Sequence, residues 1–426
     1  MTLPDVLQLQ EPLKEGGIRT VNFFNGRLLT SKDLSREQSA RREADWRQGL
    51  ARGDGVAFGL DVGPDEAVSK SGAPVLRITS GLAINRRGQA LRLTDDLSVA
   101  LTRSFDATVA TTCTFAACDP LIGGTYVAGA GVYVLSVAPA EISEGKAPTN
   151  GLDPNNVRCN MDSTVEGLQF RLHAVPPQEY GPLGIGEPWF RNALAYRCFG
   201  DDVRAPWFAD LLKALPRRET LLDTLRATTL TDYDVPLALL FITGVAKVEF
   251  IDQWAVRRPL SRASADAWRS LVDDRRLAVG QAMFLQFQRH ILDGAAPSGN
   301  LSPITARTHF RYLPPAGVIP VPEETDQTDA AATRFFAGMT YRGPAFINAA
   351  RLEGLLRESL MYPPIDTQSP ELIWLYRVRE NRMAIDFAGA GKPRSYLAFA
   401  SGHLPYRADA QFDLGYWNYG NYALAR

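Results

Sequence analysis

The stretch that decides the fold is VNFFNGRLLTSKDLSREQSARREADWRQGLARGDGVAFGLDV, residues 21–62. Its order of residue types predicts a turn, a long polar helix, a glycine-rich end and a strand. Asn25-Gly26 is a turn dipeptide because both residues tolerate positive φ, and the apolar pairs on either side allow a short hairpin. Thr30 followed three residues later by Asp33 fits a capping box, so we expect a helix over residues 31–52.

This predicted helix has too narrow an apolar face for an ordinary core helix. Ala40, Ala44 and Ala51 recur at helical spacing, but Trp46 and Leu50 project elsewhere and most other positions are polar. Two interpretations stay open: a solvated helix that lies across a sheet through its Ala, Trp and Leu, or a helix that a neighbouring subunit covers through Arg-rich contacts. In the second interpretation, the contact residues are Arg36, Arg41, Arg42, Trp46 and Arg47.

Length and composition narrow the class of protein. A chain of 426 residues exceeds one small core and predicts two or three domains. The net charge of −1 gives no reason to expect nucleic acid or an anionic membrane surface as a partner. The N-terminus lacks the pattern of a secretory signal, and the most apolar window, 121–138, is rich in Gly and β-branched residues. We therefore expect cytoplasmic synthesis and no membrane span.

The patterning along the chain predicts an α+β fold. Alternating apolar residues over 75–101 predict a β-meander, and those over 235–256 predict a hairpin. The region over 264–293 predicts a long helix whose two apolar stripes face two partners. We expect an N-terminal arm (1–20), a β-rich, sandwich-like antiparallel domain with the polar helix (21–260), and a helical segment, linker and C-terminal α+β domain (261–426).

No sequence motif points to catalysis. Hydrolase, zinc-protease, Walker A and EF-hand patterns are absent, so we expect no catalytic residue, no cofactor and no enzymatic activity. The cysteines at 113, 118, 159 and 198 have no zinc-site spacing, which makes buried free thiols the default and a zinc site with His173 the alternative. A hydrolase with a dispersed site remains a second alternative, and Cys159 beside His173 would be its sign.

The C-terminal tail YWNYGNY is dense in aromatic residues. Flat rings stack on the apolar faces of sugars, so these residues could form a glycan- or receptor-binding platform. They could equally bury against the protein's own sheet or at a subunit interface. The candidate binding residues are Tyr416, Trp417, Tyr419 and Tyr422.

Several segments carry a resemblance to a known group of proteins. They are FFNGRLLTSKDLSREQ, DGVAFGLDV, SGLAINRRGQALRL, EGLQFRLHAV, HFRYLPPAGVIPV and ELIWLYRVREN. Together they resemble uncharacterised proteins encoded with extracellular contractile injection systems and related phage-tail-like particles. The resemblance implies a non-enzymatic structural or accessory component of such a particle, at the baseplate or as a fibre or collar attachment. It also implies other tail subunits as partners and a homo-oligomeric state, and it carries over no active-site residue.

Overall fold

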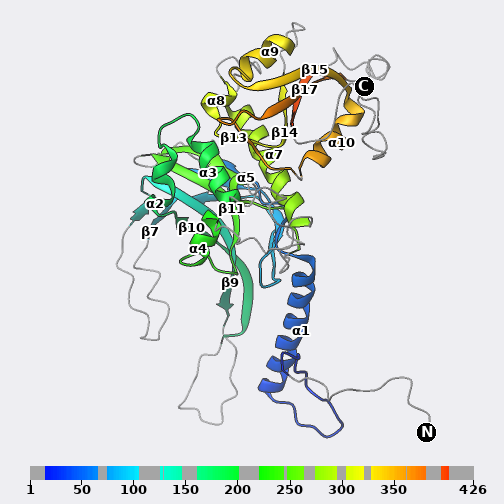
Figure 1. Ribbon diagram of the computed structural model, residues 1–426. Coiled ribbons are helices and arrows are strands. Elements are labelled where there is room, and N and C mark those ends of the chain that lie inside the picture. The colour runs from blue at the N-terminus through cyan, green and yellow to red at the C-terminus, as the bar shows by residue number, and fades with distance from the viewer. Residues whose placement is uncertain are drawn as a thin grey trace, which may run out of the picture.

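The fold is mixed α+β. It is seen in a computed structural model that describes residues 15–65, 74–104, 125–127, 129–145, 161–200, 220–243, 247–262, 274–294, 304–320, 328–360, 362–379 and 395–402. Figure 1 shows a body of sheets and helices, a second lobe above it, and one helix that stands off below. The aromatic tail and the cysteines at 113, 118 and 159 lie outside the described residues.

Helix α1 (Ser31–Arg52) begins and ends where the local signals predict. The Thr30 hydroxyl accepts from the backbone N–H of Asp33, and the Asp33 carboxylate accepts from the backbone N–H of Thr30, which completes the capping box. Hydrogen bonds with Thr30, together with Arg27, lower the pKa of Asp33. Gly53 ends the helix with a positive φ of 104°. Local chemistry therefore marks both ends of this helix.

Two small sheets follow α1 and replace the predicted meander. One has the order β1-β4-β5 and the other the order β2-β3-β6, and every pairing is antiparallel. Strands β4 and β5 pair in sequence as a meander requires, but β3 and β6 belong to the other sheet, so the predicted meander is confirmed only for its central hairpin. The strands are β1 (Gly55–Gly59), β2 (Val62–Pro64), β3 (Val75–Ile78), β4 (Gly81–Ile84), β5 (Ala90–Leu93) and β6 (Leu97–Ala100). A separate pair joins β7 (Thr102–Ser104) to β8 (Thr125–Val127).

The central sheet has the order β10-β9-β11-β12 and is antiparallel throughout. Both of its faces are covered, because alternate residues point to opposite sides. Val134 of β9 joins a core with helices, whereas Leu135 and Val137 join a core with the small sheets. The strands are β9 (Gly131–Glu144), β10 (Ser163–Ala174), β11 (Val235–Thr243) and β12 (Lys247–Asp252). The predicted hairpin over 235–256 is confirmed up to residue 252, after which the chain turns into helix α5.

Helices cover one face of the central sheet, and α7 connects that face to the C-terminal lobe. Its elements are α2 (Pro177–Tyr180), η3 (Gly181–Leu183), α3 (Phe190–Phe199), α4 (Leu221–Arg226), α5 (Gln253–Val256) and α7 (Asp274–Gly294). Ala282 and Met283 of α7 pack in the core under the central sheet, whereas Phe287 and Ile291 pack in the C-terminal core. The two predicted faces of this helix therefore serve two cores of the same chain.

The C-terminal sheet has the order β14-β18-β17-β15, with β15 and β17 parallel and the other pairs antiparallel. Phe399 on one face packs with Phe287 of α7, and Tyr376 on the other packs in the core that includes Leu355 of α10. The elements are α8 (Ala306–His309), β13 (Tyr312–Leu313), β14 (Ala316–Pro320), α9 (Thr328–Phe335), β15 (Thr340–Asn348), α10 (Ala349–Ser359), β16 (Ile365–Asp366), β17 (Leu372–Arg379) and β18 (Ser395–Ser401).

Buried polar contacts from α3 join the body to the C-terminal lobe. Arg191 donates from Nε to Asp252 and from Nη1 to Asp293 of α7, both at 2.9 Å. The side-chain oxygen of Asn192 accepts from the backbone N–H of Tyr312, and its amide nitrogen donates to the carbonyl of the same residue. These bonds satisfy polar groups that would be costly to bury alone, so they fix the junction.

Candidate docking surface

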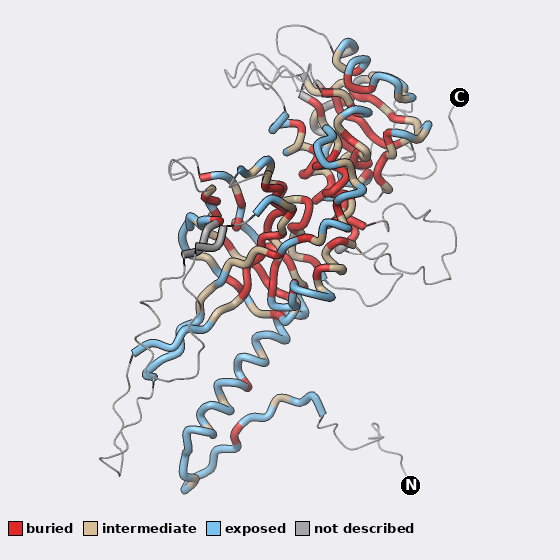
Figure 2. Tube along the Cα trace, turned by 90° about the vertical axis from the view of Figure 1, so that its left-hand side faces the viewer, coloured by how far each residue is buried: buried red, intermediate tan, exposed pale blue. Residues whose placement is uncertain are grey.

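Helix α1 does not lie across a sheet, so the first interpretation of its narrow apolar face was wrong. Figure 1 and Figure 2 both show it extending from the body, with exposed residues along almost its whole length. Only Ala40 and Gly49 of the helix are buried. Trp46 and Leu50, which were expected to touch a sheet, have 37% and 53% of their surface exposed.

The base of α1 is held by contacts that only glycine permits. A Cβ on Gly49 would lie 2.0 Å from the carbonyl oxygen of Gly88, in the turn between β4 and β5. A Cβ on Gly53 would lie 2.0 Å from the carbonyl oxygen of Ser261, and Asp54 exchanges two backbone hydrogen bonds with Ser261. Backbone therefore meets backbone at two places, which sets where the helix leaves the body.

The segment before the helix runs back along it. The backbone N–H of Val21 donates to Glu37 Oε2 at 3.2 Å, and Arg47 Nη2 donates to the Gly16 carbonyl at 2.6 Å. Val21 and Ala40 are the buried residues of this pairing. Asn25-Gly26 forms the predicted turn, but no strand flanks it, so the predicted hairpin is wrong.

The turn and the helix start form an apolar tip. Because no strand orders this segment, the apolar pairs beside the turn face solvent instead of each other. Leu28 has 86% of its surface exposed and Phe24 has 63%. The exposed large apolar side chains of the tip are Phe23, Phe24, Leu28, Leu29 and Leu34. A group of this kind marks an interaction site more often than a free surface.

A second projection runs beside α1. The outer ends of β9 and β10 continue past the central sheet as a two-stranded hairpin. Glu141 and Glu166 lie directly opposite each other on it, and the Arg42 guanidinium is 3.3 Å from the first carboxylate and 3.5 Å from the second. Like charges opposite each other destabilise a strand pair, so Arg42 offsets that repulsion and ties the hairpin to the helix.

The five predicted contact residues therefore divide into two groups. Arg42 and Arg47 are engaged within the chain, since Arg47 also pairs with Glu43 at 2.7 Å. Arg36 and Arg41 are exposed and form no ion pair with any residue that the structure describes. Trp46 is partly exposed near the base of the helix. Of the predicted contact residues, Arg36 and Arg41 are thus the cations that α1 can offer to a partner.

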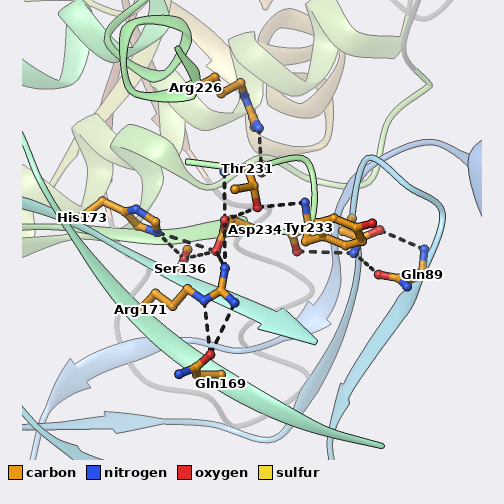
Figure 3. A network of polar contacts seen from close by, with 10 residues as sticks. Gln89, Ser136, Gln169, Arg171, His173, Arg226, Thr231, Tyr233 and Asp234 are labelled. Atoms are coloured by element: carbon orange, nitrogen blue, oxygen red, sulfur yellow. Dashed lines mark hydrogen bonds and ion pairs between the residues drawn. The ribbon is translucent and has the colours of Figure 1, made fainter. Parts of the chain in front are cut away.

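Two alternatives from the sequence, a zinc site and a hydrolase with a dispersed site, both involve His173. The alternation of residues 167–175 leaves a surface or interface role for His173 as open as ligation, but the side chain is buried and lies beside Ser136 and Asp234 (Figure 3). Ser136 donates from Oγ to Asp234 Oδ1 at 2.9 Å, and Oγ is also 2.9 Å from His173 Nε2. Cys159, the proposed partner of His173 in a hydrolase, lies outside the described residues.

These three residue types are those of a hydrolytic triad, but their arrangement differs from one. In a triad, serine donates to one ring nitrogen and the carboxylate accepts from the other. Here, Ser136 and Asp234 Oδ1 both approach the same nitrogen, His173 Nε2, at 2.9 and 3.6 Å. The hydroxyl donates its single proton to the carboxylate, which leaves it an acceptor for the ring. The geometry is that of a satisfied polar network inside a sheet.

The charge of Asp234 fits the same structural role. Burial alone would raise the pKa of this carboxyl group, but hydrogen bonds from His173, Thr231 and Ser136 outweigh burial and lower the pKa well below its ordinary value. Arg171 adds an ion pair at 3.4 Å (Figure 3). The carboxylate is therefore held ionised and accepts hydrogen bonds from the turn at Thr231.

A pocket of about 250 Å³ lies where α3 meets β13. Its wall includes the aromatic residues Trp189, Tyr196 and Tyr312, and among the described residues no Asp, Glu, His, Cys or Ser lines it. Its two arginines form ion pairs with carboxylates, Arg197 with Glu179 and Arg311 with Asp366. Apart from its two tyrosines, of which Tyr196 has its pKa raised by burial, the described wall offers no acid, base or nucleophile of the usual types.

Comparison with known proteins gives no family or relative from which a function could be inferred. No protein-family model matches this chain, and no curated protein matches it either. Within the described residues, no three His, Cys, Asp or Glu side chains gather as metal ligands, and the sole cysteine, Cys198, is buried, which raises the pKa of its thiol to about 12. No helix among the described segments is long and apolar enough to span a membrane.

Sequence reasoning missed the hairpin that faces α1. Prolines at 139, 148 and 154 in the sequence favour a long polar loop over residues 139–165, but β9 continues to Glu144 and β10 begins at Ser163. The alternation of small, apolar and charged residues over 141–144 was the available signal. Nothing in the sequence indicated that Glu141 and Glu166 would meet Arg42, because that contact depends on the direction in which α1 leaves the body.

Proposed function

We propose that this protein is a non-enzymatic structural component of a phage-tail-like contractile particle, which it joins through the tip and the exposed sides of α1. The observation that supports this proposal is the exposure of Phe24 and Leu28 at the end of a helix that extends from the body. Isolated helices are marginal in water, and an apolar tip gains free energy only when a partner covers it.

The particle setting rests on the resemblance of the sequence segments to proteins of such assemblies. A component of a symmetric particle must bury surface on its neighbours, and a projecting element makes that contact without disturbing the body. The polar network around Asp234 and the pocket beside α3, which no described carboxylate, His, Cys or Ser lines, give no support to a hydrolase. The baseplate, fibre and collar positions remain equally open within this proposal.

The test uses particles produced from the gene cluster that encodes this chain. Phe24→Ser with Leu28→Ser removes the apolar tip, while Phe58→Ser with Ile185→Ser changes two exposed apolar side chains elsewhere. Particles are sedimented, and the amount of this chain in them is measured by mass spectrometry. We expect the control to sediment like the wild type and the tip variant to fall at least about tenfold, which corresponds to about 1.4 kcal/mol of lost binding. Equal sedimentation of both variants, or absence of the wild-type chain from particles, would contradict the proposal.

A further inference from the structure

The two projections carry opposite charge. Residues 15–52, the basic projection, contain eight Lys or Arg and five Asp or Glu, a net charge of +3. The outer end of the β9–β10 hairpin, residues 139–145 and 161–167, contains four acidic residues and no basic residue. We call this part the acidic hairpin, and its acids are Glu141, Glu144, Asp162 and Glu166.

Exposed apolar side chains gather on these same two projections. Among the described residues, fifteen large apolar side chains are exposed, and ten of them belong to the basic projection or the acidic hairpin. On the hairpin, Ile142 and Val165 lie directly opposite each other and are 66% and 46% exposed. Charge alone would leave these surfaces solvated, so the apolar component indicates that they are covered in the assembled state.

The hairpin presents different chemistry on its two faces. Glu141 and Glu166 contact Arg42 on the face toward α1. Side chains alternate along a strand, so Ile142, Val165 and Glu144 lie on the opposite face, away from α1 of the same chain. One face is thus satisfied within the chain, and the other presents an apolar pair beside a carboxylate.

We infer that the protein forms a two-fold dimer in which α1 of each copy docks on the acidic hairpin of the other. This inference rests on the proposed function, because it uses the same projections as docking elements and names their partner as a second copy of this chain. Arg42 is an example of this contact within one chain, because it already joins α1 to the hairpin through Glu141 and Glu166. Arg36 and Arg41, which form no ion pair with a described residue, supply cations for the contact between copies.

The placement of the two projections favours a two-fold axis over a ring. Both extend from the same side of the body, as Figures 1 and 2 agree, and Arg42 holds them next to each other. A two-fold rotation brings the helix of each copy onto the hairpin of the other, so two equal contacts form at once. A ring would instead need the donor and acceptor surfaces on opposite sides of the molecule.

The test is a charge exchange on the full-length protein. The helix variant carries Arg36→Glu and Arg41→Glu, and the hairpin variant carries Glu144→Arg and Asp162→Arg. The control carries Arg92→Glu and Arg334→Glu, two exposed arginines outside both projections. Molar mass is measured by size-exclusion chromatography with light scattering, and the dissociation constant by analytical ultracentrifugation. Circular dichroism and thermal unfolding check that each variant folds.

We expect the wild type and the control to be dimers and each single-surface variant to be a monomer, with a dissociation constant at least about tenfold higher. An equimolar mixture of the helix and hairpin variants should form a dimer again, because both contacts then pair opposite charges. Raising the salt from about 50 to about 500 mM should weaken the wild-type dimer. A monomeric wild type, a helix variant that stays dimeric, or a mixture that stays monomeric would overturn the inference.

The dimer and the particle role can fail separately. A chain that sediments with particles but is monomeric in solution would remove the dimer and leave the proposed function standing. If the charge-exchange test shows a dimer but the chain is absent from particles, the proposed function is ruled out and the dimer is supported.

Discussion

Gly49 of α1 and Gly88 of the β4–β5 turn meet backbone to backbone, so close that a Cβ on either would lie 2.0 Å from a main-chain carbonyl oxygen of the other element. Gly88 also has a φ of 81°, which L-residues rarely adopt. This contact, at the base of a helix that is otherwise exposed, sets the direction in which α1 leaves the body.

Alanine at Gly49 should therefore destabilise the protein, although alanine is the better helix former. Helix propensity would contribute about 0.5–1 kcal/mol of stability. The clash with backbone should cost about 1–3 kcal/mol, since backbone gives way less readily than a side chain. Urea unfolding measures the net change. Gly63→Ala is the control, because a Cβ there meets nothing within 4 Å. Equal stability of the two variants would argue against the close contact.

Arg42→Ala should loosen the hairpin from the helix with little loss of global stability. All three side chains of this contact are about half exposed or more, so the ion pairs contribute roughly 0–1 kcal/mol. Hydrogen exchange should become faster at residues 141–144 and 163–166, where Glu141 and Glu166 would then repel each other. Arg92→Ala, at an exposed arginine outside both projections, should leave those amides unchanged.

Asp234→Asn should destabilise the protein by about 2–4 kcal/mol at pH 7, because the buried partners of the carboxylate lose a charged acceptor. Asp232→Asn, an exposed neighbour, should change stability by less than about 0.5 kcal/mol. Urea unfolding of the two variants gives the comparison. If Asp234→Asn lowers the free energy of unfolding no more than Asp232→Asn does, the result would contradict the network shown in Figure 3.

The cost of Asp234→Asn should also depend on pH. The pKa of Asp234 is lower in the folded protein than its ordinary value of 3.8. Ionisation therefore stabilises the fold above the unfolded pKa, and this contribution is lost as pH falls through the folded pKa. The difference in unfolding free energy between wild type and variant should be constant from pH 7 to about 5 and should shrink below about 4. A difference that grows toward low pH would reverse the sign of the argument.

Ser136 should not react with a fluorophosphonate probe. Its side chain is fully buried, and its hydroxyl donates to Asp234 instead of to an imidazole base. Intact-mass analysis after exposure to the probe should show no adduct, with a serine hydrolase in the same tube as the positive control. An adduct mapped to Ser136 would revive the hydrolase alternative.

Short-range chemistry made part of this fold predictable. The capping box at Thr30 and Asp33 acts within one turn, so the start of α1 could be located without knowing what surrounds it. The same holds for the central strand β11, whose apolar run is long enough to require burial on both sides. The predicted contact residues Arg36 and Arg41 are exposed, as the polar character of the helix indicated.

Tertiary structure decided how these local elements are used. Whether α1 lies on a sheet or stands away from it depends on the Gly49–Gly88 contact, between residues far apart in the sequence. Ser136 and Asp234 are separated by 98 positions and carry no mutual signal, yet strand pairing brings them together. For elements such as α1 and β11, the sequence alone determined whether a helix or a strand forms, because caps and periodicity act over a few residues. Only the folded chain determined which of their surfaces remain open to a partner, because that depends on what packs against each one.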